Sequence, residues 1–248
     1  MSILQNATND GGEQALIVTL FGTPGTGKTS TALTFPKPYM IRTQGEAVPR
    51  DAPSKAASMG LTDSPAKLWE QLTALCKDEH DFKTLIVDSS TGLEGMFIKD
   101  VLDNDPKARG INTALGGYGA GRAAVAAQHA KLRKGAEYLR SVRGMHIVFI
   151  GHADIERIDP PDSESYSKYS LRLHRESMKS YVDDVDVVGF LRQATILRGE
   201  EDERKKAITT GDIILTTTLH PAFVSKNRLG IKDDIVVQMG VNPLQDYI

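Results

Sequence analysis

The sequence lacks the features of a membrane-spanning, secreted or disulfide-stabilised protein. Its 248 residues contain one cysteine, Cys76, which excludes an intrachain disulfide and a cysteine-rich zinc site. The chain has no run of about 18 apolar residues, the length that crosses a membrane. Its N-terminus carries neither the basic nor the apolar segment of a secretory signal. These absences predict a cytoplasmic protein without a membrane partner.

The sequence also lacks an excess of charge of either sign. Lys and Arg number 30 against 32 Asp and Glu, which leaves a net charge of −2. Any contact with nucleic acid must therefore come from a local basic surface. Residues 121–143 qualify, because they carry six basic side chains against a single acid, Glu137. The solvated face of an ordinary helix is the alternative interpretation.

The length fits one large domain, because single α/β domains often reach about 200–250 residues. Residues 1–14, rich in Asn, Gly and Asp, are expected to form a flexible lead-in. The rest of the sequence contains no internal repeat and no low-complexity linker. Residues 15–248 are therefore predicted to form a single domain.

Apolar runs alternate with residues at helical spacing along the first part of the chain. The runs predict buried strands at residues 15–21, 39–43, 84–88 and 145–150. Strands that are apolar along their whole length indicate a mostly parallel sheet with helices on both faces. Later β-type runs at residues 185–197 and 213–219 are expected to add antiparallel strands. The predicted fold class is α/β.

The segment after the first predicted strand matches G-x-x-x-x-G-K-[ST], the pattern of a phosphate-binding loop. The residues expected to bind ATP are Gly22, Thr23, Pro24, Gly25, Thr26, Gly27, Lys28, Thr29 and Ser30. Glycines let backbone N–H groups curl around phosphate oxygens. Lys28 adds a positive charge for the terminal phosphates, and Thr29 offers a hydroxyl to Mg²⁺. A glycine turn before an ordinary helix is the alternative.

Asp88 ends the apolar run at residues 84–88. The carboxyl end of a parallel strand is where ligands of α/β sheets bind. We therefore expect Asp88 to hold Mg²⁺, as a phosphate-binding loop requires. Capping of the following helix is the alternative role for this carboxylate.

Hydrolysis needs a polar group that orients or deprotonates the attacking water. Glu46, shortly after the second predicted strand, and its neighbour Gln44 are the first candidates, and Glu94 is a weaker one. His152, directly after the fourth strand, is expected to read the γ-phosphate or to hydrogen-bond the water. A surface carboxylate at Glu46 and a histidine satisfied by nearby backbone are the alternatives.

Two cations, Lys226 and Arg228, follow the turn at His220 and Pro221. Such a pair can clamp phosphates in a neighbouring subunit, as an arginine finger does. Solvated surface charge is the alternative.

Taken together, the motifs resemble the RecA/RadA-type ATPase core over nearly the whole chain. The resemblance rests on Gly-Thr-Pro-Gly-Thr-Gly-Lys28-Thr29, Leu-Ile-Val-Asp88, a Gly-Gly-Tyr-Gly119 loop, a strand ending in Gly151-His152, and Lys226-Asn227-Arg228-Leu-Gly230. More closely, the chain resembles the compact phage-encoded ATP-binding proteins grouped with the Sak-type single-strand annealing recombinases.

The resemblance implies a RecA-like fold and ATP hydrolysis linked to binding and annealing of single-stranded DNA. It assigns Mg²⁺ to Thr29 and Asp88 and γ-phosphate sensing to His152. It also assigns phosphate contact to Lys226 and Arg228 across the subunit interface of a homo-oligomeric ring or filament. By the same resemblance, the chain is a phage protein that works in the host cytoplasm beside a single-strand-binding protein.

One motif departs from the family pattern. Relatives place the catalytic base in Asp-Thr-Glu-Gly, whereas this chain reads Arg-Thr-Gln44-Gly-Glu46. Either Glu46 acts from a shifted position, or Gln44 only orients the water.

DNA is expected to contact the loop at residues 105–121 and the loop after His152. The residues assigned to phosphate neutralisation and base stacking are Arg122, Lys131, Arg133, Lys134 and Tyr118, with Tyr166 and Tyr169 as further stacking candidates. Tyrosines that only anchor the loops are the alternative.

Two other functions fit the phosphate-binding motif. A small-molecule P-loop kinase would need an acceptor pocket and an Arg-bearing lid, for which residues 42–53 are the candidate. The second is a nucleotide-gated binding module with negligible hydrolysis, because the sequence does not decide which residue is the catalytic base.

Overall fold

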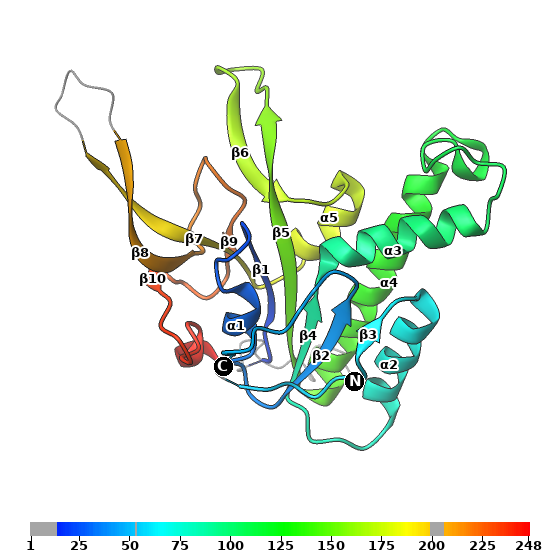
Figure 1. Ribbon diagram of the computed structural model, residues 1–248, viewed down its shortest axis with the longest axis horizontal. Coiled ribbons are helices and arrows are strands. Elements are labelled where there is room, and N and C mark those ends of the chain that lie inside the picture. The colour runs from blue at the N-terminus through cyan, green and yellow to red at the C-terminus, as the bar shows by residue number, and fades with distance from the viewer. Residues whose placement is uncertain (1–13, 53, 199–205) are drawn as a thin grey trace, which may run out of the picture.

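A central β-sheet runs through the molecule, and helices cover both of its faces (Figure 1). The computed structural model describes residues 14–52, 54–198 and 206–248. Within these residues the strands follow the order β10-β8-β7-β1-β5-β4-β2-β3, with β6 paired to β5 and β9 paired to β7. The predicted α/β class is confirmed.

The middle of the sheet is parallel. Its parallel strands are β7 (Val187–Arg198), β1 (Ile17–Gly22), β5 (His146–Ile158), β4 (Thr84–Asp88), β2 (Pro38–Thr43) and β3 (Leu61–Thr62). The antiparallel pairings involve β6 (Tyr166–Leu171), β8 (Lys206–Thr216), β9 (Lys226–Asn227) and β10 (Ile235–Val236). A mostly parallel sheet with antiparallel C-terminal strands is what the sequence predicts.

Each face of the sheet has its own apolar core. The helices on the first face are α2 (Pro65–Lys77), α3 (Ser90–Asp103), α4 (Ala120–Arg143) and α5 (Arg175–Val182), with the short η2 (Ala114–Gly116). On the second face lie α1 (Lys28–Ala32) and the segment around η3 (Gln245–Tyr247). Alternation along β1 sends Ile17 and Phe21 into the first core and Val18 and Leu20 into the second. A strand buried on both faces is therefore almost entirely apolar; the polar exception in β1 is Thr19, whose hydroxyl donates a hydrogen bond to the Tyr181 carbonyl oxygen.

The direction of β7 differs from the sequence prediction. Its first part runs parallel to β1, with Val187 opposite Val18 and Leu191 opposite Gly22. Only its pairings with β8 and β9 are antiparallel. The apolar pattern cannot distinguish the two directions, because a strand buried between neighbours looks the same in either.

The fourth predicted strand does not end at His152, and no loop follows it there. β5 continues to Ile158 because β6 supplies backbone partners, from Leu171 opposite Ala153 to Tyr166 opposite Ile158. The sequence signal is weak here because most residues from Asp154 onward are exposed. The turn comes after Ile158 instead, and it joins β5 to β6.

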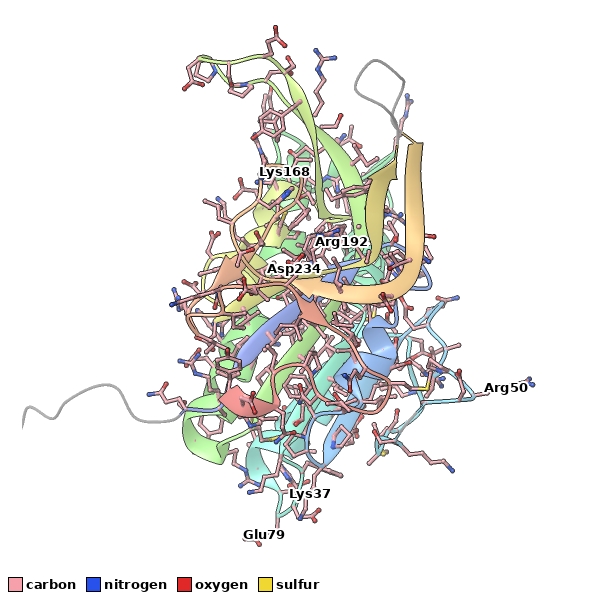
Figure 2. All side chains as sticks on the ribbon, turned by 90° about the vertical axis from the view of Figure 1, so that its left-hand side faces the viewer. Lys37, Arg50, Glu79, Lys168, Arg192 and Asp234 are labelled. Carbon is pink, nitrogen blue, oxygen red and sulfur yellow. The ribbon has the colours of Figure 1, made fainter. Side chains whose placement is uncertain are left out.

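Two β-ribbons extend past the carboxyl end of β1 (Figure 1). β1 ends at Gly22, in register with His152 of β5 and Leu191 of β7. Beyond that level β5 continues with β6, and β7 continues with β8, so the ribbons flank the segment that follows β1. Figure 2 labels Arg192 of β7 beside Asp234; their ion pair of 3.0 Å ties β7 to the segment before β10.

One sequence prediction falls largely outside the described residues: residues 1–13 of the expected lead-in are not described. In the described part of the chain, none of the helices combines the length and the apolar character needed to cross a membrane.

Candidate functional site

The segment between β1 and α1 forms a tight glycine-containing loop. Gly25 and Gly27 have φ angles of 80° and 74°, a region that side-chain-bearing residues seldom adopt. Gly22 lies against β7, and a Cβ atom there would lie 2.3 Å from the carbonyl oxygen of Leu191. Gly25 and Gly27 are therefore needed for the conformation of the loop, and Gly22 is needed for its close packing against β7.

Lys28 is buried at the start of α1 and faces this loop. Its ammonium group donates hydrogen bonds to the carbonyl oxygens of Gly22, at 3.1 Å, and Thr23, at 2.8 Å. Burial lowers the pKa of Lys28, while the nearby carboxylates of Asp88 and Glu46 raise it. The lysine is thus a desolvated cation held next to the loop, ready to exchange carbonyl oxygens for phosphate oxygens.

Asp88 and Thr29 meet at the carboxyl edge of the sheet. The Thr29 hydroxyl donates a hydrogen bond of 2.8 Å to the Asp88 carboxylate. Burial is the main reason that the pKa of Asp88 rises to about 6. The buried carboxylate and the hydroxyl are hard oxygen donors, the type that Mg²⁺ prefers, so these two residues fit a magnesium site.

Glu46 and His152 form a second polar pair at this edge. His152 Nε2 lies 2.9 Å from Glu46 Oε1, and the same oxygen accepts a hydrogen bond of 2.6 Å from the Ser89 hydroxyl. The hydrogen bond from His152 is the largest cause that lowers the pKa of Glu46; burial opposes it, and the Ser89 bond and the charge of Lys28 add to the lowering. Glu46 is therefore held as a carboxylate beside the phosphate loop.

The other two candidate bases lie elsewhere. Gln44 is exposed and lines a hollow with residues of β3, α2 and α3. Glu94 belongs to a buried network, in which His129 lies 2.9 Å from Glu94 and 2.6 Å from the Tyr181 hydroxyl. This network packs α3, α4 and α5 together. Of the three candidates, the structure brings only Glu46 to His152, Asp88 and Lys28.

Lys226 and Arg228 lie at the opposite edge of the sheet. β9 pairs with the first residues of β7, whereas the phosphate loop follows the last residue of β1. The Lys226 ammonium group donates to the carbonyl oxygens of Val182 and Asp183 at the end of α5. Arg228 lies 3.9 Å from Asp186. Neither cation reaches the phosphate loop of its own chain, and contact with a neighbouring subunit stays a prediction.

The basic segment at residues 121–143 forms α4, and its arginines have partners. Arg133 bonds Glu137 at 3.1 Å and the carbonyl oxygen of Asp184. Arg122 lies 3.8 Å from Glu94.

The remaining DNA candidates are more exposed. The Lys131 ammonium group lies 4.1 Å from the centre of the Trp69 ring, whereas Lys134 projects into solvent. Tyr118 is fully exposed, in the loop before α4. Tyr169 is half-buried and stacks on Phe190 against the core, so it is less exposed than Tyr118.

Sequence reasoning missed Ser89, which lies between the two polar pairs. Its hydroxyl accepts a hydrogen bond of 3.1 Å from the backbone N–H of Gly92 and caps α3. The cap of this helix is therefore Ser89 and not Asp88, the alternative role considered for the aspartate. The sequence offers one signal for this cap, a serine directly after the aspartate that ends the predicted strand.

One comparison with known proteins gives a match. A family model described as an AAA domain matches residues 14–229. A search of curated proteins finds no match to the chain. The family match spans the phosphate loop, the strand that ends in Asp88 and the strand that carries His152. The chain therefore belongs to the AAA-domain family and is a nucleotide-binding P-loop ATPase.

Proposed function

We propose that the protein is a magnesium-dependent ATPase that binds single-stranded DNA and promotes annealing, with nucleotide held between subunits of a homo-oligomer. One observation carries the hydrolytic part of this proposal. The carboxylate of Glu46, bonded to His152 at 2.9 Å, lies at the same sheet edge as Lys28, Thr29 and Asp88. The chain thus offers a phosphate loop, metal ligands and a base in one place.

The phosphate-binding groups have separate roles. Backbone N–H groups of the glycine loop and the Lys28 ammonium group bind the β- and γ-phosphates. Thr29 and Asp88 would hold Mg²⁺, which when bound neutralises charge that develops on the phosphate oxygens. Asp88 must be ionised to bind the metal, so acid weakens its contribution.

Glu46 is assigned as the general base. It accepts a proton from the attacking water as the water oxygen bonds to the γ-phosphorus and the bond to the leaving ADP oxygen breaks. His152 contributes by orienting the carboxylate and by keeping it ionised, since its hydrogen bond lowers the pKa of Glu46. A base with a low pKa is ionised at neutral pH but accepts the proton only as the transition state forms.

The DNA-binding part of the proposal rests on the loop between α3 and α4 and on the family resemblance. Leu115 and Tyr118 have φ angles of 55° and 50°, and Asp105 bonds the Leu115 backbone N–H at 2.7 Å. The loop presents the exposed Tyr118 ring, and the Asp105 carboxylate holds the backbone three residues before it. A ring of this kind can stack on bases, while Lys131 and Lys134 neutralise phosphates.

The decisive experiment measures ATP turnover with and without single-stranded DNA, for the wild type and for Glu46→Gln. We expect turnover that requires Mg²⁺ and rises with DNA, and a loss of about 10²–10⁴-fold in the variant with nucleotide binding retained. A Glu46→Gln variant with unchanged turnover would remove the assignment of the base.

The same experiment separates the other functions. ADP formation that requires an acceptor other than water would identify a small-molecule kinase. Tight ATP binding without phosphate release, in the presence and absence of DNA, would identify a nucleotide-gated binding module. Turnover without any response to single-stranded DNA, combined with no DNA binding in solution, would contradict the DNA-binding part alone.

A further inference from the structure

We infer that Ser89 is a positioning residue for ATP hydrolysis: its hydroxyl holds one oxygen of the Glu46 carboxylate and leaves the other oxygen for the attacking water. This inference rests on the proposed role of Glu46 as the base. Ser89 belongs to none of the sequence motifs; it lies between the expected metal ligand and the first residue of α3.

The direction of the Ser89 hydroxyl hydrogen is determined by its contacts. Ser89 Oγ accepts a hydrogen bond from the Gly92 N–H at 3.1 Å and lies 2.6 Å from Glu46 Oε1. A serine hydroxyl has one hydrogen, and an ionised carboxylate can only accept, so that hydrogen points at Glu46. Ser89 is fully buried, so water does not compete for it.

The backbone of Ser89 is fixed as well. Its N–H donates a hydrogen bond of 3.0 Å to the Thr43 hydroxyl, which itself donates to the Asp88 carbonyl oxygen at 3.3 Å. Thr43 also lies against Gly92, where an added Cβ atom would stand 2.1 Å from the threonine hydroxyl oxygen. The ends of β2 and β4 and the start of α3 therefore pack tightly together. This packing fixes the position of Ser89, and the Ser89 hydroxyl in turn fixes the position of the Glu46 carboxylate.

Both donors to Glu46 use the same carboxylate oxygen. His152 Nε2, at 2.9 Å, and Ser89 Oγ, at 2.6 Å, each bond Oε1. Among the described hydrogen bonds, Oε2 receives none. The carboxylate is thus anchored through one oxygen, and the second oxygen is available to accept a proton from water.

The test compares Ser89→Ala with Ser90→Ala. Ser90 provides a matched control because it is buried in the same turn, but its hydroxyl bonds the Ile150 carbonyl oxygen at 3.0 Å. For Ser89→Ala we expect kcat to fall about tenfold, since the lost hydrogen bond is made to a charged group. We also expect the acidic limb of the kcat profile to move to higher pH, because the Ser89 bond lowers the pKa of Glu46. Ser90→Ala should change neither quantity.

A double-variant cycle separates positioning from the structural effect of losing the helix cap. If Ser89 acts through Glu46, Ser89→Ala should cause no further loss of turnover in a Glu46→Gln background. Ser89→Thr, which keeps a hydroxyl, should restore both turnover and the pH profile. A full additional loss in the Glu46→Gln background would overturn the inference.

The failures of the two proposals are distinguishable. If Glu46→Gln is inactive while Ser89→Ala keeps the wild-type rate and pH profile, Ser89 has no positioning role and the base assignment stands. If Glu46→Gln keeps full turnover, both assignments fail together. Should Ser89→Ala not fold, Ser89→Gly takes its place, because glycine is well tolerated at a helix N-cap: a lower kcat with a shifted pH profile supports the role of the hydroxyl, and a wild-type rate and profile contradict it.

Discussion

Lys28 and Arg133 are both cations on elements that the sequence marks as basic or phosphate-binding, but the protein surrounds them in different ways. Lys28 is bonded to two backbone carbonyl oxygens and lies beside a loop built to receive an anion. Arg133 is bonded to the Glu137 carboxylate and to the Asp184 carbonyl oxygen, so it joins α4 to the segment after α5. A count of charges along the sequence cannot separate a cation that binds a ligand from one that holds helices together.

The largest effect is expected at Lys28. Lys28→Ala should reduce ATP turnover by about 10³-fold or more, because the charge that stabilises the terminal phosphates in the transition state is removed. The fold should persist, since the substitution also removes a desolvated charge. Steady-state turnover and thermal unfolding check both expectations. Normal turnover in this variant would show that Lys28 does not act on the phosphates, and its difference from Arg133 would not hold.

Asp88 should give the protein a pH-dependent stability of unusual sign. The pKa of its carboxyl rises on folding from 3.8 to about 6, so the folded protein binds the proton more tightly than the unfolded chain. Its contribution to the free energy of unfolding is therefore lost as pH increases from about 4 to 6, by up to about 3 kcal/mol without metal.

The Asp88→Asn variant tests this expectation in the absence of nucleotide and Mg²⁺. It should be more stable than the wild type at pH 7 by about 1–3 kcal/mol, and it should lose magnesium-dependent turnover. Glu46→Gln is the control, because the pKa of Glu46 is lowered and its contribution runs in the opposite direction. Urea unfolding between pH 4 and 8 measures both slopes. If the free energy of unfolding depended on pH equally in wild type and Asp88→Asn, burial would not raise the pKa of Asp88.

Arg133→Ala should lower the free energy of unfolding by about 1–2 kcal/mol, because a largely buried side chain loses two hydrogen bonds. We expect the affinity for single-stranded DNA to change little. Denaturant unfolding and fluorescence anisotropy check the two quantities. A large loss of DNA affinity with unchanged stability would show that Arg133 behaves like Lys28.

The smallest effect is expected at Lys134, the matched counterpart of Arg133 on the same helix. It is exposed and forms no ion pair with any described residue. Lys134→Ala should leave stability within about 0.5 kcal/mol of the wild type. If α4 contacts phosphates, it should weaken DNA binding several-fold and reduce the salt slope by about one. Titrations at several salt concentrations measure that slope.

Much of the fold could be predicted because the signals are local. Apolar runs identify the central strands, and the spacing from Gly22 to Thr29 identifies the phosphate loop. Asp88 ends β4 at the residue that the sequence indicates. Each of these features depends on neighbours in the chain, which sequence patterns record directly.

The rest depends on partners far away in the chain. Glu46 and His152 are 106 positions apart, and no local pattern could favour Glu46 over Gln44. Arg133 finds its carbonyl partner 51 positions later. β5 continues past His152 because β6 pairs with it, and that pairing has no apolar signature. Such features follow from tertiary packing and not from propensity.

The order of strands in the sheet also bears on how the chain acquires its fold during synthesis. β1 is made first, but the partners of its backbone come much later: the backbone N–H of Ile17 bonds Asp186, 169 positions on, and that of the preceding Leu16 bonds His146, 130 positions on. Closing such long loops costs entropy before any contact is gained, which slows folding. We therefore expect a nascent chain to assemble its glycine loop only after β5 and β7 have left the ribosome, and a translation product cut short before β7 to lack nucleotide binding.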